Sequence, residues 1–467
     1  MYSSKASSKH SPKHCVVLDI VGFSASLLGE NTPNINRYIQ ANASCPMEGV
    51  FPAVTTTAQS SMLTGLLPSE HGVVGNGWYE RDMAEVMFWK QSNSLVQGNK
   101  IWHKLKQTLP DFRTSKIFWW YNMYADVEAS ITPRPHYPAD GRKIIDLYST
   151  PPGLHQSIES KIGKFPFFSF WGPKAGLPAS RWIADAAMLE YQQNKPNLQL
   201  VYLPHLDYCL QKYGPSSPLI GAEVKAIDAV VGELLDFYEQ QSATVLLVSE
   251  YGIVDVDTPI HINRILREHG YLEVRDSLTW ELLDPGASRA FAVSDHQVAH
   301  VYLKYECDRA AVKQLLENLP GVDCVLDHEE KKQWGIAHAR AGDLVVVSKE
   351  NAWFTYYYWL DERKAPDFAP TVDIHRKPGY DPAEMFVDQS LRFPMLKVMM
   401  RLLQKKLGMR MLMDVISLDA SLVKGSHGRP ASTIDLGPIF IGPKDMVTGE
   451  GMKMTDVAGK IEAFFAD

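Results

Sequence analysis

The sequence predicts an α/β protein in which a doubly wound, mostly parallel sheet carries an inserted α+β lobe. Short apolar runs alternate with helical segments in the first half of the chain, a pattern typical of a sheet with helices on both faces. Four runs have the length and apolar content of buried parallel strands, and two helical patterns lie between them. The predicted strands are residues 16–20, 116–119, 198–203 and 244–249, and the predicted helices are residues 58–64 and 222–238.

The first predicted strand, Cys15-Val-Val-Leu-Asp-Ile20, carries a carboxylate near its end, Asp19. Ligands and catalytic groups in open α/β sheets gather at the carboxyl ends of the strands, so this position suits chemistry. A structural aspartate in a strand-to-loop turn is the commoner explanation for such a residue on its own. The hydroxyl groups that follow along the chain favour the catalytic interpretation.

Three consecutive threonines, Thr55, Thr56 and Thr57, stand where a turn should lead into the helix predicted for residues 58–64. A hydroxyl at the amino end of a helix meets unpaired N–H groups and the positive end of the helix dipole, which can hold a phosphate and stabilise an alkoxide. At least one threonine is expected only to cap the helix. A nucleophilic threonine near neutral pH needs a metal ion beside it.

These motifs resemble, in kind and in order, the nucleotide pyrophosphatase/phosphodiesterase branch of the alkaline phosphatase superfamily. Members share a strand-end Asp, a Thr ten residues before the Gly of a Thr-Gly pair, and a downstream His-Gly followed by Asn. Asp19 matches the first feature, Thr55 lies ten residues before Gly65, and Glu70-His-Gly-Val-Val-Gly-Asn76 reproduces the third. The resemblance continues in residues 202–215, Ser249-Glu-Tyr-Gly252 and Gly425-Ser-His-Gly428.

The resemblance implies an alkaline-phosphatase-like fold and two divalent metal ions, commonly zinc. One metal would be held by an Asp, a His four residues later and a late His, which correspond here to Asp207, Gln211 and His427. The other would be held by Asp19, Thr55 and an Asp-His pair, whose place is taken by Glu250 and Tyr251.

Gln211, Glu250 and Tyr251 each change an expected ligand. Glutamate keeps the charge but moves it by one methylene, the glutamine amide oxygen is a weak zinc ligand, and the tyrosine phenol must ionise to bind well. These changes shift the preference from zinc toward Mn, Mg, Ca or Fe, or weaken binding.

Several histidines could supply replacement ligands. His296 and His300 are four residues apart, His375 is two after Asp373, and His205 is two before Asp207. On a strand, residues two apart lie on the same face. A hydrogen-bonded structural or surface role is the commoner explanation for each of these histidines.

The resemblance also implies that Asn76 donates to a phosphoryl oxygen. A neutral donor suits diesters, whereas monoesterases need more positive charge around the extra phosphate oxygen. A turn asparagine between two glycines is the alternative explanation.

The sequence therefore predicts a metal-dependent hydrolase of phosphodiester or pyrophosphate bonds. Thr55 would attack phosphorus in line and form a phospho-threonine or nucleotidyl-threonine intermediate that water then hydrolyses. The alternatives are a pseudoenzyme or binding protein with lost or rerouted metal sites, and a phosphonate or sulfate ester hydrolase.

The inserted lobe is expected at residues 299–370, between a first part of the core at residues 1–298 and a second at residues 371–467. In this superfamily such a cap shapes the substrate pocket. Its predicted elements are a strand at 300–305, a helix at 309–318 and strands at 322–327 and 343–348, after which the core resumes near residue 372.

Whole-chain properties fit a large soluble enzyme. The 467 residues are 45% hydrophobic, enough for a sizeable core, and the net charge of -7 argues against general nucleic-acid binding. Five scattered cysteines and the absence of a CxxC motif disfavour a disulfide framework. The polar amino terminus lacks an apolar signal region and no transmembrane segment is evident, so a cytoplasmic protein is expected.

Two segments bear on the partner, which is expected to be a small phosphorylated substrate such as a nucleotide or a lipid or isoprenoid phosphate. Residues 118–124 are rich in aromatic side chains, for which core packing is the commoner role and base stacking the alternative. Residues 395–413 mix Leu and Met with basic residues. This amphipathic pattern is compatible with peripheral membrane contact, although a helix packed on the sheet is more usual.

Overall fold

The computed structural model describes residues 13–140, 142–447 and 451–466. Its centre is a nine-stranded, mostly parallel sheet, which confirms the predicted fold class. The strand order is β21-β2-β20-β9-β1-β8-β5-β6-β7, where β21 is Met452–Lys453, β2 is Ala43–Glu48, β20 is Ile439–Gly442, β9 is Thr244–Val248, β1 is Cys15–Ile20, β8 is Leu198–Leu203, β5 is Thr114–Ile117, β6 is Ala129–Pro133 and β7 is Leu147–Thr150.

Strand β1 lies between β9 and β8, is parallel to both, and is buried along its whole length. Its alternate side chains enter two different cores, because successive residues of a strand point to opposite faces. Val16, Leu18 and Ile20 belong to one hydrophobic cluster, whereas Cys15 and Val17 belong to another. The near-continuous apolar run predicted from the sequence is thus a strand covered on both sides.

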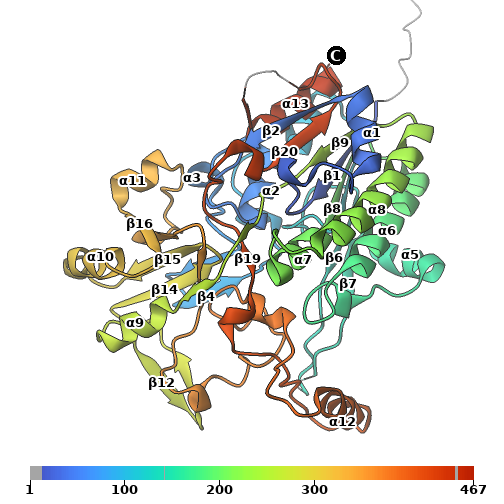
Figure 1. The fold of residues 1–467 in the computed structure, drawn as a ribbon. Helices are drawn as coiled ribbons and strands as arrows, with labels where there is room; N and C mark the ends of the chain where they lie inside the picture. The colour runs from blue at the N-terminus through green and yellow to red at the C-terminus, as the bar shows by residue number, and fades with distance from the viewer. Residues whose placement is uncertain (1–12, 141, 448–450, 467) are drawn as a thin grey trace, which may run out of the picture.

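Helices cover both faces of the sheet, as Figure 1 shows. One face is covered by α1 (Pro33–Ala41), α5 (Leu154–Ile162), α6 (Leu177–Asn194) and α8 (Ile220–Gln240). The other is covered by α2 (Thr55–Thr64), α4 (Ile101–Thr108) and α13 (Asp456–Ala466). The helix α7 (His205–Tyr213) follows β8 directly and contacts α8.

A second lobe, on the left in Figure 1, is built on an antiparallel four-stranded sheet of order β14-β15-β17-β16. Its strands are β14 (Ala290–Asp295), β15 (Val298–Leu303), β17 (Leu344–Ser348) and β16 (Val322–Leu326), with helices α9 (Ile262–Glu268), α10 (Arg309–Glu317) and α11 (His328–Gln333). Hairpins β3–β4 (Gly77–Glu80, Glu85–Phe88) and β12–β13 (Val274–Ser277, Trp280–Leu283) complete the antiparallel part.

Short strand pairs and two further helices connect these parts. The strand pairs are β10 (Val254–Asp255) with β19 (Gly425–Ser426) and β11 (Thr258–Ile260) with β18 (Ala352–Phe354). The helices are α3 (Pro68–His71) and α12 (Pro394–Lys406). No helix among the described residues combines the length and apolarity needed to cross a membrane. The amino-terminal residues 1–10, on which the expectation of a cytoplasmic protein rested, lie outside the described residues.

Three element predictions need correction. The strand predicted at 116–119 is β5 and ends at Ile117, because Phe118 has a φ of 62° and leaves the extended conformation. The second sheet begins at Ala290 rather than at residue 299, since β14 and β15 form one hairpin. The sequence predicts that the core resumes near residue 372, but residues 371–438 add no strand to the large sheet. The next strand of that sheet is β20. The assignment of domains stays a prediction.

Gly425 lets β19 approach α7 closely. A Cβ built on Gly425 would lie 2.2 Å from the carbonyl oxygen of Leu210. We expect Gly425→Ala to lower the free energy of unfolding by about 1 to 3 kcal/mol, because backbone must move to relieve the overlap. Urea unfolding followed by circular dichroism measures the change.

Gly459 is the matched control. It lies in α13, and a Cβ there would meet no atom within 4 Å. Gly459→Ala should raise the free energy of unfolding by about 0.5 to 1 kcal/mol, since alanine favours the helix. Equal effects of the two substitutions would contradict the packing argument.

Candidate active site

The candidate site lies at the carboxyl ends of three adjacent strands. Asp19 is near the end of β1, Glu250 comes two residues after β9, and Asp207 lies in the first turn of α7, which follows β8. Since β9, β1 and β8 are parallel neighbours, their ends meet at one edge of the sheet. All three carboxyl groups are buried.

Asp19 and Glu250 form a pair of neighbouring carboxyl groups. Burial, and then the neighbouring Glu250, hold the pKa of Asp19 well above its usual range, and burial raises the pKa of Glu250 to about 6. The amide nitrogen of Gln59 lies between them, 3.3 Å from Asp19 Oδ2 and 2.7 Å from Glu250 Oε1. The backbone N–H of Trp120 donates to Gln59 Oε1 at 2.7 Å and so holds this amide.

Thr55 is the first residue of α2, and the residue that precedes the helix is Val54. The expectation that a threonine caps the helix is therefore wrong, since all three threonines lie within its first turn. Thr56 and Thr57 instead donate their hydroxyls to the carbonyls of Gly75 and Val73. Thr55 is left to face the carboxyl groups, with its Oγ1 2.9 Å from the hydroxyl of Tyr251.

Tyr251 joins the two groups of predicted ligands. Its hydroxyl contacts Thr55 Oγ1 and donates to Asp207 Oδ1 at 3.1 Å. Its ring stacks on the His427 imidazole, with centroids 3.6 Å apart and an interplanar angle of 8°. Burial raises the pKa of the Tyr251 phenol well above its usual range, so this side chain is a neutral donor and acceptor.

His427 Nδ1 donates to the Ala53 carbonyl at 2.7 Å, which leaves the Nε2 lone pair free. Nε2 lies 3.6 Å from Asp207 Oδ1. Burial lowers the pKa of the imidazole well below its usual range, so it is neutral, the state in which histidine binds metals. Burial also raises the pKa of Asp207 to about 7.

Only one of the suggested replacement histidines joins this group. His296 Nδ1 donates to Asp295 Oδ1 at 2.9 Å, and the centroid of its ring lies 3.8 Å from the centroid of the His427 ring. His300 is structural, because its nitrogens contact the Val74 carbonyl and the Gly342 N–H. The four-residue spacing between His296 and His300 did not indicate these backbone contacts.

His375 and His205 also lie differently from the expectation. Asp373 and His375 lie in a loop rather than on a strand, and His375 Nδ1 is directed to the Phe88 carbonyl at 3.4 Å. His205 begins α7, and two helical positions differ by about 200° in direction, so it does not share a face with Asp207.

Gln211 and Asn76 are both engaged by other side chains. Gln211 Oε1 accepts from the hydroxyl of Tyr380 at 2.9 Å. Asn76 accepts the backbone N–H of Thr56 at 3.1 Å and donates its amide to Asp295 Oδ1 at 3.1 Å. Asn76 therefore caps α2 from outside the helix.

Sequence reasoning missed Gln59, Asp295 and Tyr380. Gln59 lies four residues after Thr55, so helical spacing could have placed both on one face of α2. Asp295 directly precedes His296, whereas Tyr380 carried no signal. The aromatic segment after β5 serves mainly in the core, since Phe118, Trp119, Trp120 and Tyr121 are buried.

The chemistry of these side chains fits divalent cations. Among the described residues, no lysine or arginine pairs with Asp19, Asp207 or Glu250. Buried acidic groups need a counter-charge, which a metal ion would supply. Several buried polar atoms also find no hydrogen-bond partner among the residues that the structure describes: Asp19 Oδ1, Glu250 Oε2, His296 Nε2, His427 Nε2 and Gln211 Nε2. All but the last, an amide donor, can bind a metal.

Comparisons with known proteins identify a matching family and structural relatives. The profile of the family described as type I phosphodiesterase / nucleotide pyrophosphatase matches residues 15–381. A curated relative from Schizosaccharomyces pombe, an uncharacterized pyrophosphatase/phosphodiesterase, is 22% identical over 260 residues, which cover 54% of this chain and 46% of the relative. The match thus spans less than half of that relative's length.

Two solved structures illustrate the shared fold. Murine ectonucleotide pyrophosphatase/phosphodiesterase 5, as an inactive threonine-to-alanine variant in complex with AMP, has a TM-score of 0.58 and 15% identity, with 97% of this chain and 95% of the other covered. Phosphonoacetate hydrolase from Sinorhizobium meliloti 1021, in complex with phosphonoacetate, has a TM-score of 0.59 and 15% identity over 97% and 96% of the chains.

The carboxyl pair predicts an unusual stability effect. Because folding raises the pKa of Asp19 and of Glu250, the metal-free folded protein binds protons more strongly than the unfolded chain above about pH 4, so at pH 7 these two groups lower the free energy of unfolding. Asp19→Asn should therefore raise the free energy of unfolding when chelator is present. Urea unfolding at pH 7 with and without chelator measures this.

Asp228→Asn serves as the control for a buried aspartate. Asp228 accepts hydrogen bonds from the backbone N–H groups of Asn34 and Ile35 at 3.0 and 2.9 Å. Its substitution should lower the free energy of unfolding by about 1 to 3 kcal/mol, because these donors lose their charged acceptor. A loss of similar size for Asp19→Asn would contradict the metal-site interpretation.

Proposed function

Because the chain belongs to the type I phosphodiesterase / nucleotide pyrophosphatase family, we propose that it hydrolyses phosphodiester or pyrophosphate bonds through a covalent intermediate on Thr55. One observation carries the proposal. The Thr55 hydroxyl stands in the first turn of α2, against Tyr251 and beside a group of three buried carboxyl groups that no described basic residue neutralises. A nucleophile and a cation site therefore adjoin each other.

The chain's own residues can prepare Thr55 for attack on phosphorus. Tyr251 remains protonated, so its hydroxyl can donate to Asp207 while it accepts from Thr55. This chain of hydrogen bonds leads from the Thr55 hydroxyl to the Asp207 carboxylate, so it orients the hydroxyl for attack. Attack forms the Thr55 Oγ1–phosphorus bond and expels the leaving group, and water then cleaves that bond in the second step.

Asn76 is the proposed donor to the substrate phosphate. Its amide nitrogen carries two hydrogens, and Asp295 accepts from it at 3.1 Å. One hydrogen therefore stays available for a phosphoryl oxygen. As a neutral donor beside the amino end of α2, it suits the charge of a diester.

Two divalent metals are the proposed cofactors. Asp19, Glu250 and the Thr55 hydroxyl would hold one, and Asp207 and His427 would hold the other, with His296 added to the predicted set. When bound, such ions neutralise phosphate charge and lower the pKa of coordinated oxygen nucleophiles. The first ligand set contains only oxygen, which favours Mn or Mg over zinc. Gln211 and Tyr251 would act as hydrogen-bonding neighbours rather than as strong ligands.

A specific observation also favours the alternative of a binding protein. The Gln59 amide contacts both Asp19 and Glu250, and the Tyr251 ring covers His427. These contacts satisfy part of the site without a metal.

The substrate is proposed to be a small phosphorylated compound. Structural relatives of the same fold bind AMP and phosphonoacetate. A diester of a nucleotide or of a lipid fits a neutral phosphate donor such as Asn76, so the choice between them depends on the second lobe and on membrane access.

We also propose that α12 contacts an anionic membrane surface. In Figure 1 the helix projects beyond the rest of the fold, and none of its residues is buried. Lys397 and Arg401 pair with Asp414, whereas Lys405 and Lys406 form no ion pair among the described residues. Basic residues beside exposed apolar ones favour an anionic lipid surface. The exposed apolar residues are Phe393, Met395, Leu396, Met399, Met400, Leu402, Leu403, Leu407 and Met409.

The catalytic proposal predicts that Thr55→Ala abolishes turnover. With bis-p-nitrophenyl phosphate and added Mn²⁺, the rate should fall by roughly a thousandfold or more, as is typical when a nucleophile is removed. Elemental analysis of protein purified without chelator should find at least about two metals per chain. Inactive wild-type protein that no divalent metal rescues would favour the binding-protein alternative.

Thr57→Ala is the matched control from the same helical turn. Its hydroxyl donates to the Val73 carbonyl at 3.1 Å and does not face the carboxyl groups. The variant should lose about 1 kcal/mol of stability and keep its turnover within a few fold. If Thr55→Ala is equally active, the covalent mechanism is wrong.

The membrane proposal predicts flotation with vesicles that contain phosphatidylserine, and release at high salt. Met399→Glu with Leu403→Glu should abolish flotation, because two carboxylates then replace exposed apolar contact area. Met83→Glu, at an exposed methionine in the β3–β4 hairpin, is the control and should float normally. Wild-type protein that stays soluble, or self-associates through α12 instead, would contradict the proposal.

A further inference from the structure

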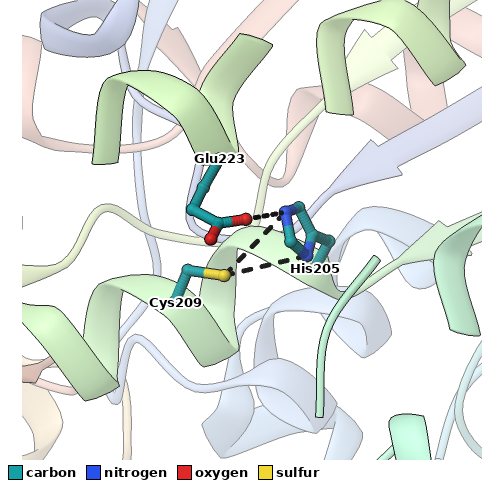
Figure 2. Close-up of side chains that lie close together, drawn as sticks. All are labelled: His205, Cys209 and Glu223. Carbon is teal, nitrogen blue, oxygen red and sulfur yellow. Dashed lines mark hydrogen bonds and ion pairs between the residues drawn. The ribbon is translucent and has the colours of Figure 1, made fainter. Parts of the chain in front are cut away.

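A second group of ligand-type side chains lies outside the candidate active site. Figure 2 shows His205 and Cys209, one turn apart on α7, facing Glu223 of α8. One ligand atom from each of the three side chains lies within 4.8 Å of the others. Among the described residues this is a compact cluster that mixes nitrogen, sulfur and oxygen ligands.

The separations approach those of a tetrahedral metal site. His205 Nε2 lies 3.0 Å from Glu223 Oε2 and 3.8 Å from Cys209 Sγ. Zinc bonds of about 2.0 to 2.3 Å place adjacent tetrahedral ligands about 3.3 to 3.6 Å apart. Small side-chain rotations would therefore suffice, while the backbone of α7 and α8 stays in place.

The surroundings leave room for a fourth ligand. His205, Cys209 and Glu223 line one wall of a cavity of about 260 Å³. His205 and Cys209 are buried, and Glu223 is partly exposed at the cavity surface. A water molecule from this cavity could complete a four-coordinate ion.

The charges also balance. A thiolate from Cys209 and the Glu223 carboxylate together neutralise a divalent cation, which lowers the cost of holding it in a mostly buried place. Burial and the nearby Glu223 raise the pKa of the Cys209 thiol, so without a metal the thiol is protonated. Lys212 and Lys174 also line the cavity, and their positive charges oppose the cation.

We propose that His205, Cys209 and Glu223 form a separate zinc site that ties α7 to α8. Along α7, the two ligands of this site alternate with two residues that face the candidate active site. Asp207 and Gln211 face the carboxyl groups and Tyr380, whereas His205 and Cys209 face the cavity. A metal on the outer face of α7 would therefore fix the helix that carries Asp207. The site stands independently of the proposed hydrolase activity.

Cobalt substitution tests the proposal in the full chain. Co²⁺ added to metal-free protein should bind with thiolate-to-cobalt charge-transfer absorption in the near ultraviolet, because Cys209 ionises on coordination. The band requires a cysteine ligand, and no cysteine is among the residues proposed for the active site. Failure of the active-site proposal would therefore leave this test unaffected.

Cys209→Ser should remove the band, whereas Cys307→Ser, at an exposed free thiol, should keep it. Glu223 is partly exposed, so Glu223→Gln carries little risk to folding. This variant should weaken zinc binding by at least about ten- to a hundredfold, because removal of a group that only orients a metal ligand already causes a loss of that size. No band with wild-type protein, or a band that survives Cys209→Ser, would overturn the proposal.

Discussion

The structure of the site depends on burying three carboxyl groups at one edge of a parallel sheet. Asp19, Glu250 and Asp207 lie at the carboxyl ends of adjacent strands, and the described residues provide no basic side chain that pairs with them. Such a group is costly in a protein interior unless it is protonated or bound to a cation. The raised pKa values of these groups express that cost, and the surrounding polar contacts reduce it.

Tyr251 and Gln59 connect the polar groups of the site. The Tyr251 hydroxyl links Thr55 to Asp207. Gln59 spans the carboxyl pair. His296 enters from the hairpin of the second lobe, and its ring is tilted against that of His427, with ring centroids 3.8 Å apart. The second lobe therefore contributes directly to the centre of the site.

Sequence reasoning located the residues that follow strands or stand in motifs. Asp19, Asp207, Glu250 and His427 could be found because the ends of parallel strands converge and because the motifs occur in a known order. Tyr380 could not be found, since it reaches the site through the long-range packing of a loop. Histidine spacing misled for His300, whose two nitrogens serve backbone groups. The catalytic roles of the assembled residues stay proposals.

The sequence by itself determined the fold class, the buried strands and the order of the motifs, because periodicity and apolar content are local properties. Only the tertiary structure decided which side chains share one site. It turned Asp207 toward Tyr251 and His205 toward Glu223, although both belong to the same turn of α7. A helix presents its residues to different neighbours, and those neighbours are placed by the folding of the whole chain.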